Sequence, residues 1–557
     1  MRTIISIFRL VGPFSARRSY IVAKVGALLR PPKIRGFKIL VIVGGALAFI
    51  FSGCKNEVKK HPNVIFISFD DLRPELGCYG NEEIKSPNLD KFAEAGMVFL
   101  NTYCQVAVCQ PSRASYMTGL RPDSVGSWHL GDHHRGVHPE IVTMPQYFHK
   151  YGYYTVSIGK IFHNFVYDSI SWDEPDLRPE EYKTPDKINR DAESFHYDDE
   201  ITAKQLELRA ARKSNNPGVK LYADGWGYGK SVEAPDLPDV VLYDGAQTEL
   251  AIETIARLKD MDKPFYLALG YFRPHLPFVA PKEYWDLYDA DSITPAPNPF
   301  LPVDAPGFAM NSTYELGACY DIAEYQKHPA LGPLPDTIQK KLKHGYYASV
   351  SYVDACFGKL IDALENMNLM DNTVIALVGD HGWKLGEHGS WCKQTNYEND
   401  TRVPMIIYAP GIKGAGKKTE RLTELVDIFP SLCELAGIDV ADYLQGTSVV
   451  PLLQEPDREW KSAIFSQFHR RPRVAIDGQR YMGYAIRTDR YHYIEWYHWD
   501  DEKDVPIDSV TCELYDHSDD PQENYNIAGK QENKDLIVQL SKQLEAGWKA
   551  ARPSRER

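Results

Sequence analysis

The run Asn63-Val64-Ile65-Phe66-Ile67-Ser68-Phe69 is followed directly by Asp70 and Asp71. A short, continuous apolar run rich in β-branched residues is typical of a strand buried on both faces of a parallel sheet. Such sheets bind ligands at the carboxyl ends of their central strands. Paired acids in a loop are more often a solvated turn, but at the end of a buried strand they favour a metal site.

The alternation of strand and helix continues along the chain. We expect helices at residues 87–95, 144–150, 248–258, 338–367 and 427–436, and strands at 96–100, 153–158, 264–272, 373–378 and 404–408. This order predicts an α/β fold with a mostly parallel central sheet flanked by helices. Three of these strands end in polar or charged residues, namely Lys160 with His163, His275, and Asp380 with His381.

A second informative stretch is Cys109-Gln110-Pro111-Ser112-Arg113, which continues to Thr118-Gly119. We expect Cys109 to lie at the N-terminus of a helix, with Pro111 preventing an earlier helix start. The free N–H groups and the dipole at such a terminus favour an anion. The alternative is a buried, unreactive cysteine, which is the common fate of a lone Cys.

Composition limits the class of protein. The 557 residues are 43% hydrophobic and 25% charged, as expected for a globular chain of two to four domains. The formal net charge of −13 argues against a nucleic-acid partner, because no basic block interrupts the acidic balance. An anionic substrate therefore requires a local pocket of Lys, Arg and His. The 34 tyrosines suit sugar rings, although an aromatic-rich core is the simpler explanation.

The N-terminal region has the features of an export signal. Residues 1–37 are basic, residues 38–51 form an apolar run too short for a confident membrane span, and Ser52-Gly53-Cys54 follows. Small residues before a cysteine resemble a bacterial lipoprotein box. We expect removal of residues 1–53, lipidation of Cys54 and a tether at 54–61, placing an exported bacterial lipoprotein at the cell surface or in the periplasm. A secretory signal or an N-terminal anchor remains the alternative.

The texture of the sequence changes near residue 461. Short alternating strands at 463–468, 483–488 and 491–497 predict a small antiparallel sheet, and residues 533–551 predict a closing helix. We therefore expect a catalytic domain at 62–460 and a C-terminal subdomain at 461–557. Residues 168–240 are charged, Pro-rich and weakly periodic, which indicates a surface insertion.

From Asn63 onwards the chain resembles the type I sulfatases, which have an alkaline-phosphatase-like fold, and within them the iduronate-2-sulfatase family. The matching segments are Asp70-Asp71-Leu72-Arg73-Pro74, the Cys109 stretch, Gly159-Lys160 with His163, Pro274-His275, Asp380-His381-Gly382-Trp383 and Gly386-Glu387-His388-Gly389. The resemblance implies that a maturation enzyme oxidises Cys109 to formylglycine (3-oxoalanine). It also implies a sulfated carbohydrate as substrate.

The chemistry of a sulfate ester explains these residue types. The ester is an anion, so positive charge must precede the nucleophile. The residues that provide it or act on the reacting groups are Cys109, Arg113, Lys160, His163, Lys393 and His275, the last as general acid by the resemblance. A cysteine thiolate would be trapped after attack, whereas a formylglycine hydrate has one hydroxyl to attack and another to expel sulfate.

A hard cation such as Ca²⁺ fits the predicted metal site. Asp70, Asp71 and Asp380, with an oxygen of modified Cys109, suit such an ion. The resemblance adds His381, a nitrogen ligand that calcium does not normally select. The alternative is that this histidine does not bind the ion and instead forms a hydrogen bond to one of the metal ligands.

The substrate is less well defined by the sequence. Lys384 after Trp383 and the loop from His129 to His138 depart from the iduronate-2-sulfatase pattern, and we expect Trp383, Lys384 and His138 to contact substrate. The histidine spacing in the loop argues against zinc. A 2-O-sulfated uronate or related sugar, from a glycosaminoglycan or an algal polysaccharide such as ulvan, remains open. A phosphatase or phosphonate ester hydrolase of the same fold and a non-catalytic glycan-binding lipoprotein are the rivals.

Overall fold

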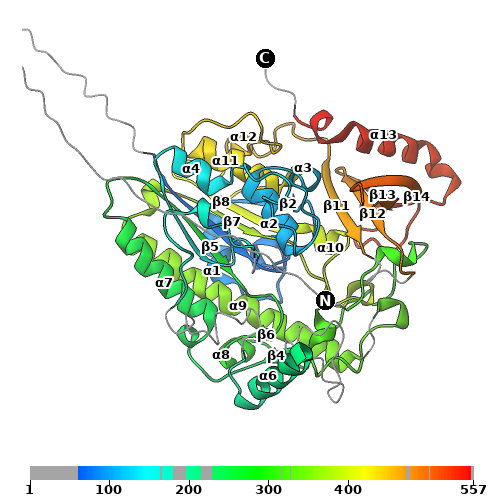
Figure 1. The fold of residues 1–557 in the computed structure, drawn as a ribbon, viewed down its shortest axis with the longest axis horizontal. Helices are drawn as coiled ribbons and strands as arrows, with labels where there is room; N and C mark the ends of the chain where they lie inside the picture. The colour runs from blue at the N-terminus through cyan, green and yellow to red at the C-terminus, as the bar shows by residue number, and fades with distance from the viewer. Residues whose placement is uncertain are drawn as a thin grey trace, which may run out of the picture. The chain divides into compact units, whose positions relative to one another are not determined.

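Strand β1 (Asn63–Phe69) lies inside an eight-stranded sheet in the computed structural model (Figure 1). The structure describes residues 61–163, 166–179, 196–214, 229–313, 315–325, 328–471, 477–500 and 502–553. The strand order is β10-β2-β8-β7-β1-β5-β3, with β9 also paired to β2. The bounds are β2 (Met97–Tyr103), β3 (Tyr154–Gly159), β5 (Phe265–Tyr271), β7 (Thr373–Gly379), β8 (Arg402–Tyr408), β9 (Lys418–Thr419) and β10 (Thr423–Glu424).

Strands β7, β1, β5 and β3 lie side by side and run parallel to one another, and β8 is antiparallel to both β7 and β2. Phe69 pairs with Gly379 on one side and with Tyr271 on the other. The carboxyl ends of β1, β7 and β5 therefore lie at one edge of the sheet. The prediction of a mostly parallel central sheet is confirmed.

Two helical layers cover the sheet because β1 is apolar on both faces (Figure 1). Ile65 and Ile67 share a hydrophobic cluster with Phe92, whereas Val64 and Phe66 belong to a second cluster. This alternation follows from the two-residue period of a strand. One layer contains α1 (Pro87–Ala95), α7 (Tyr243–Leu258) and α9 (Asp336–Asn366); the other contains α2 (Cys109–Thr118), α4 (Met144–Lys150), α11 (Ile428–Leu435) and α12 (Val450–Gln454).

The C-terminal part forms a separate four-stranded antiparallel sheet in the order β11-β12-β13-β14. Its strands are β11 (Ile464–Arg470), β12 (Tyr481–Arg487), β13 (Tyr491–Asp500) and β14 (Val505–Asp516), and α13 (Lys534–Ala550) packs against them. Leu540 of that helix is buried in one cluster with Ile486 and Leu514. The predicted antiparallel sheet is confirmed. Strand β14 was not predicted from the sequence, because its first residues are exposed and do not alternate.

The remaining elements are short or lie in connections. They are α3 (Pro122–Val125), α6 (Asp199–Ser214), α8 (Lys282–Trp285), α10 (Glu398–Thr401), β4 (Val232–Glu233) and β6 (Phe278–Val279). Within the described residues, every helix is too short or too polar to cross a membrane. The predicted leader, the lipidation of Cys54 and most of the tether fall outside the described residues.

Candidate active site

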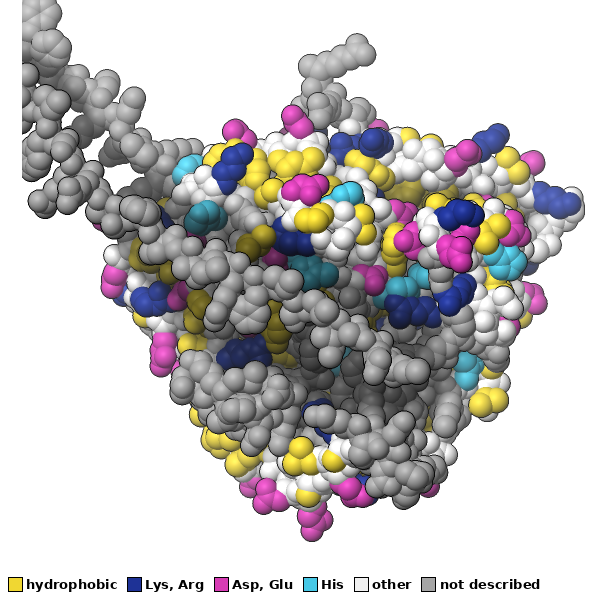
Figure 2. Space-filling view, viewed as in Figure 1, with side chains coloured by type: hydrophobic (Ala, Val, Ile, Leu, Met, Phe, Trp, Pro, Cys, Tyr) yellow, Lys and Arg dark blue, Asp and Glu magenta, His cyan; other side chains and the backbone are white. Residues whose placement is uncertain are grey.

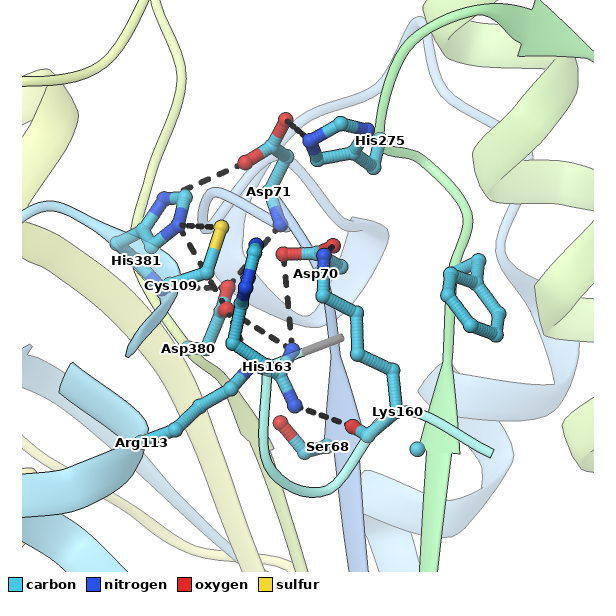
Figure 3. Close-up of polar contacts among 12 residues, drawn as sticks. Ser68, Asp70, Asp71, Cys109, Arg113, Lys160, His163, His275, Asp380 and His381 are labelled. Atoms are coloured by element: carbon cyan, nitrogen blue, oxygen red, sulfur yellow. Dashed lines mark hydrogen bonds and ion pairs between the residues drawn. The ribbon is translucent and has the colours of Figure 1, made fainter. Parts of the chain in front are cut away.

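The carboxyl ends of the central strands bring the predicted site residues together (Figure 3). Asp70 and Asp71 follow β1, Asp380 follows β7, and Lys160 follows β3. His275 lies four residues beyond the end of β5. These strands are neighbours in the order β7-β1-β5-β3, as their polar endings led us to expect. The sheet therefore delivers acids, cations and imidazoles to one buried location.

Helix α2 supplies the candidate nucleophile. Cys109 is its first residue, and its Sγ lies 3.2 Å from Nε2 of His381. The helix begins at Cys109, with Pro111 in its first turn, so the expected position of this cysteine at a helix N-terminus is confirmed. A proline in the first helical turn is tolerated because its missing N–H would have no partner there. Ser112 fixes the helix start by donating from Oγ to the Asp380 carbonyl oxygen at 2.5 Å.

Four buried side chains offer ligand atoms that all lie within 4.8 Å of one another: Asp70, Asp71, Cys109 and His381. Among the described residues, Oδ1 of the fully buried Asp70 accepts no hydrogen bond, and Nη2 of Arg113 lies 3.5 Å from it. A carboxylate oxygen in that condition is costly to bury unless a cation binds it. Asp380 lies beside this group, with its Oδ1 accepting from the Asp71 N–H at 3.1 Å. The donor set therefore fits a hard divalent cation.

His381 fits the same site as a nitrogen ligand. Its Nδ1 lies 3.0 Å from the carbonyl oxygen of Gly382, so Nδ1 carries the proton and donates it. The other nitrogen, Nε2, is then the one with a lone pair, and it faces Cys109. A backbone hydrogen bond that fixes the tautomer is typical of metal-binding histidines.

The backbone at Asp71 is held in an uncommon conformation. Its φ is 60°, in the left-handed region that non-glycine residues seldom adopt. The hydroxyl of Tyr346 donates to the Asp71 carbonyl oxygen at 2.8 Å and accepts from the Arg73 N–H at 3.1 Å. Strained backbone of this kind is concentrated at functional sites, where surrounding contacts maintain it.

Three permanent cations surround the carboxylates. Nζ of Lys160 pairs with Asp70, and Nζ of Lys393 lies 2.8 Å from Oδ1 of Asp71. Arg113 Nη2 lies 2.9 Å from Oδ2 of Asp380. All of these groups are buried. The site therefore concentrates positive charge in a low-dielectric environment, where it acts strongly on an anion.

The charges shift the pKa values of their neighbours. Burial raises the pKa of the Asp70 carboxyl, but Lys160, with other cations, lowers it well below its usual range overall. Burial raises the pKa of Asp71, and Lys393 offsets this only in part. Burial and the nearby Asp70 carboxylate raise the pKa of the Cys109 thiol well above its usual range. The unmodified thiol is therefore protonated at neutral pH and a poor nucleophile.

Glu315 is a buried acid of this site that the sequence did not indicate. Its Oε2 lies 2.9 Å from Nζ of Lys393 and 3.4 Å from Nε2 of His275. His275 donates from Nδ1 to the Leu276 carbonyl oxygen at 2.6 Å, so Nε2 is the nitrogen that faces the acid. Glu315 lies in an irregular, Pro-rich connection, without a strand ending to draw attention to it.

His163 lies among the cluster residues in Figure 3 and is almost fully buried. Its backbone N–H donates to Oε1 of Gln110 at 3.3 Å. Because Gln110 follows Cys109 in α2, this bond ties the loop after β3 to the start of the helix that carries the candidate nucleophile.

The three residues expected to contact substrate differ in how deeply they are buried. Trp383 is fully buried, and the Lys393 ammonium lies 5.1 Å from its ring centroid. Lys384 is also fully buried, with Nζ 2.6 Å from Oδ2 of Asp400. Substrate contact by Trp383 and by Lys384 therefore stays a prediction. His138 is exposed on its loop, and its role stays a prediction.

The fold and the site together thus define a catalytic α/β protein. Its site contains buried acids, cations and a cysteine at the start of a helix. Residues 62–438 match the family model described as Sulfatase, and residues 386–550 match that of N-sulphoglucosamine sulphohydrolase, C-terminal. Iduronate 2-sulfatase of Mus musculus is 31% identical over 571 residues, covering 92% of this chain and 99% of that protein. The chain belongs to the sulfatase family and is a sulfuric ester hydrolase.

Solved structures share the fold. One, determined in complex with its substrate D-glucosamine-2-N,6-O-disulfate, has a TM-score of 0.64 and 23% identity, covering 88% of this chain and 98% of that chain. The phosphonate monoester hydrolase of Silicibacter pomeroyi has a TM-score of 0.65 and 21% identity, covering 88% and 96%. The same architecture thus carries enzymes named for different ester chemistries.

Proposed function

We propose that this sulfatase hydrolyses the sulfate esters of a sulfated polysaccharide or its oligosaccharides, using a nucleophile made by oxidation of Cys109 to formylglycine. The observation that carries the proposal is the position of Cys109, at the start of α2 and beside Asp70, Asp71 and His381. The raised pKa of its thiol supports an oxygen nucleophile, because a protonated sulfur attacks poorly.

The metal that fits this site is one calcium ion. Asp70, Asp71, Asp380 and His381 would hold it, together with an oxygen of the modified residue 109. When bound, the ion would neutralise sulfate oxygens, and the hydrated aldehyde would supply the attacking hydroxyl.

The cations of the chain stabilise the negative charge on the reacting sulfate. Lys160, Lys393 and Arg113 are buried, and His163 lies beside them. Preorganised cations in a water-excluded site stabilise developing negative charge without reorganisation during the reaction. His275 is the proton donor for the leaving sugar oxygen, with Nε2 as the nitrogen that faces the site.

The substrate class is a 2-O-sulfated uronate or a related sulfated sugar. The similarity to a protein named iduronate 2-sulfatase over nearly its whole length supports this class. Both a glycosaminoglycan and an algal polysaccharide such as ulvan provide such sugars. The chain acts after export, as a lipoprotein anchored through Cys54 at the cell surface or in the periplasm, and it requires a formylglycine-generating enzyme.

Mass spectrometry of the Cys109 peptide from an active preparation tests the nucleophile. Conversion of the –CH2SH side chain to –CHO replaces sulfur by oxygen and also removes two hydrogens, so we expect the loss of mass that corresponds to both changes, which is distinct from that of a Cys→Ser exchange. An unmodified peptide in a fully active sample would exclude the mechanism.

A phosphonate or phosphate ester hydrolase is the second candidate, because a structure of that activity shares the fold. Hydrolysis of 4-nitrophenyl sulfate is compared with hydrolysis of 4-nitrophenyl phosphate and of 4-nitrophenyl phenylphosphonate. This comparison separates the sulfatase from the phosphate or phosphonate ester hydrolase. We expect the sulfate ester to be preferred.

A further inference from the structure

The loop from His129 to His138, here called the His-rich loop, lies outside the catalytic cluster. Hydrogen bonds to two aspartates hold its conformation. Oδ2 of Asp132 accepts from the N–H groups of Trp128 and His129, both at 2.7 Å. Arg135 donates to both carboxylate oxygens of the buried Asp168, at 2.6 and 2.7 Å. These bonds hold the loop in one shape.

The loop is connected to the catalytic helix. Nε2 of Gln110 donates to the Asp132 carbonyl oxygen at 3.0 Å, and Gln110 directly follows Cys109. The loop therefore lies one side chain away from the start of α2.

A hollow of about 740 Å³ lies between this loop and the C-terminal sheet. Its lining includes Trp128, His129, His133, His469, Arg471 and Arg480. Nε2 of His129 lies 2.8 Å from Nδ1 of His469, so the loop and strand β11 meet here. Trp128 lines the hollow, and its ring lies 5.8 Å between centroids from that of Trp499, which also packs on His469 at 5.2 Å.

Two arginines, Arg471 and Arg480, line the hollow together with two acids, Asp132 and Asp504. Burial, then Arg471, His469 and Arg480, lower the pKa of His129 to about 2. Burial and the neighbouring arginines lower the pKa of His469 to about 3. The arginines that lower these two pKa values are Arg470, Arg471 and Arg480. Figure 2 shows Lys or Arg and His side chains gathered beside the ends of β11 and β12 in this view.

The geometry points to a second binding site in this hollow, which takes the sulfate or carboxylate of a sugar neighbouring the one that is hydrolysed. Arg471 and Arg480 bind the anionic group, and the ring of Trp128 packs against the sugar ring. The inference rests on the proposed function and deepens it: the enzyme acts on an oligosaccharide with at least two anionic sugars, not on an isolated sulfated monosaccharide.

Kinetics of the double variant Arg471→Gln with Arg480→Gln test this site. The substrates are 4-nitrophenyl sulfate, which cannot reach the hollow, and sulfated di- and tetrasaccharides prepared from heparin and from ulvan, using whichever polysaccharide the wild type hydrolyses faster. The matched control is Arg490→Gln, which removes an exposed arginine from the same sheet where it pairs with Asp516.

We expect KM for the tetrasaccharide to rise about tenfold or more in the double variant, because each charge-assisted hydrogen bond contributes about a factor of ten. In the double variant, kcat for the tetrasaccharide and the kinetics with 4-nitrophenyl sulfate stay unchanged. The control variant has wild-type kinetics on both substrates. An unchanged KM, an equal loss on both substrates, or wild-type enzyme that binds no oligosaccharide better than the aryl ester overturns the second site. Wild-type enzyme that hydrolyses no sulfate ester at all refutes the proposed function instead.

Discussion

Replacing Glu315 by Gln tests whether this buried acid supports the proton donor of the reaction. Glu315 contacts both Lys393 and His275, at 2.9 and 3.4 Å. The substitution keeps the shape of the side chain and removes only its charge. Lys393 retains Asp71 as a partner, so the fold is expected to survive the change.

The magnitude follows from the separation. At 3.4 Å and an effective dielectric constant of about 20, a carboxylate attracts an imidazolium by about 5 kcal/mol. The Gln amide oxygen retains part of this by accepting a hydrogen bond. We therefore expect a loss of about 2–3 kcal/mol, or about 100-fold in rate, for substrates that require proton donation.

The assay compares two leaving groups. A sugar sulfate leaves as a poorly stabilised alkoxide and needs the proton from His275, whereas 4-nitrophenyl sulfate leaves as a stable phenolate. The variant should lose about 100-fold in kcat on the sugar sulfate and only a few-fold on the aryl sulfate. Glu324→Gln, an exposed acid in the same connection, is the matched control and should behave as wild type.

Two results would refute this reasoning. An equal loss on both substrates would mean that Glu315 maintains the site as a whole through Lys393. Unchanged kinetics on the sugar sulfate would mean that His275 does not need the acid, or that it is not the proton donor.

Four further outcomes are expected. Cys109→Ala should abolish turnover but leave the melting temperature close to wild type, measured by calorimetry. Chelation with EGTA should remove activity and lower the melting temperature, and Ca²⁺ should restore both, because an ion that binds the folded state stabilises it. Lys461→Met should destabilise the protein by about 3–5 kcal/mol in urea unfolding, because it leaves the buried Glu424 without one of its two cations, whereas Lys503→Met at the surface should cost under about 0.5 kcal/mol. Burial raises the pKa of Glu424, but Arg121 and Lys461 lower it to about 2 overall. The ionised carboxylate therefore stabilises the fold fully above about pH 5, and this contribution is lost as the pH falls towards 2. Glu424→Gln should flatten that part of the profile of melting temperature against pH.

Most of what the sequence predicted about the site came from the residues that directly follow the predicted strands. A run such as Asn63–Phe69 is apolar throughout, so its burial, its direction and the position of Asp70 at its end follow from elementary patterns. The same reasoning placed Lys160, His275 and Asp380 at one sheet edge, and the sheet order confirms it. Parallel strands make such inference possible, because their carboxyl ends are always at the same edge.

Other features carried no local signal. Glu315 reaches the site from an irregular connection, and only the three-dimensional path of that connection brings it to Lys393. Lys384 was expected to contact substrate, yet it is fully buried, with Nζ 2.6 Å from Oδ2 of Asp400. Burial of a charged side chain depends on a partner that is distant in sequence, so neither position was accessible to pattern reasoning.

The ion pairs of the site connect metal binding to substrate binding. Lys160 pairs with Asp70 and Lys393 with Asp71, so the lysines proposed to bind sulfate share oxygens with the carboxylates proposed to bind the cation. A divalent ion at those carboxylates satisfies their charge and leaves the ammonium groups to face an anion. The affinity for sulfate should therefore rise when calcium is present, and by linkage the affinity for calcium should rise by the same factor when sulfate is present. Calorimetric titration of calcium into the Cys109→Ala variant, with and without sulfate, measures that factor; equal affinities would show that the two sites are independent.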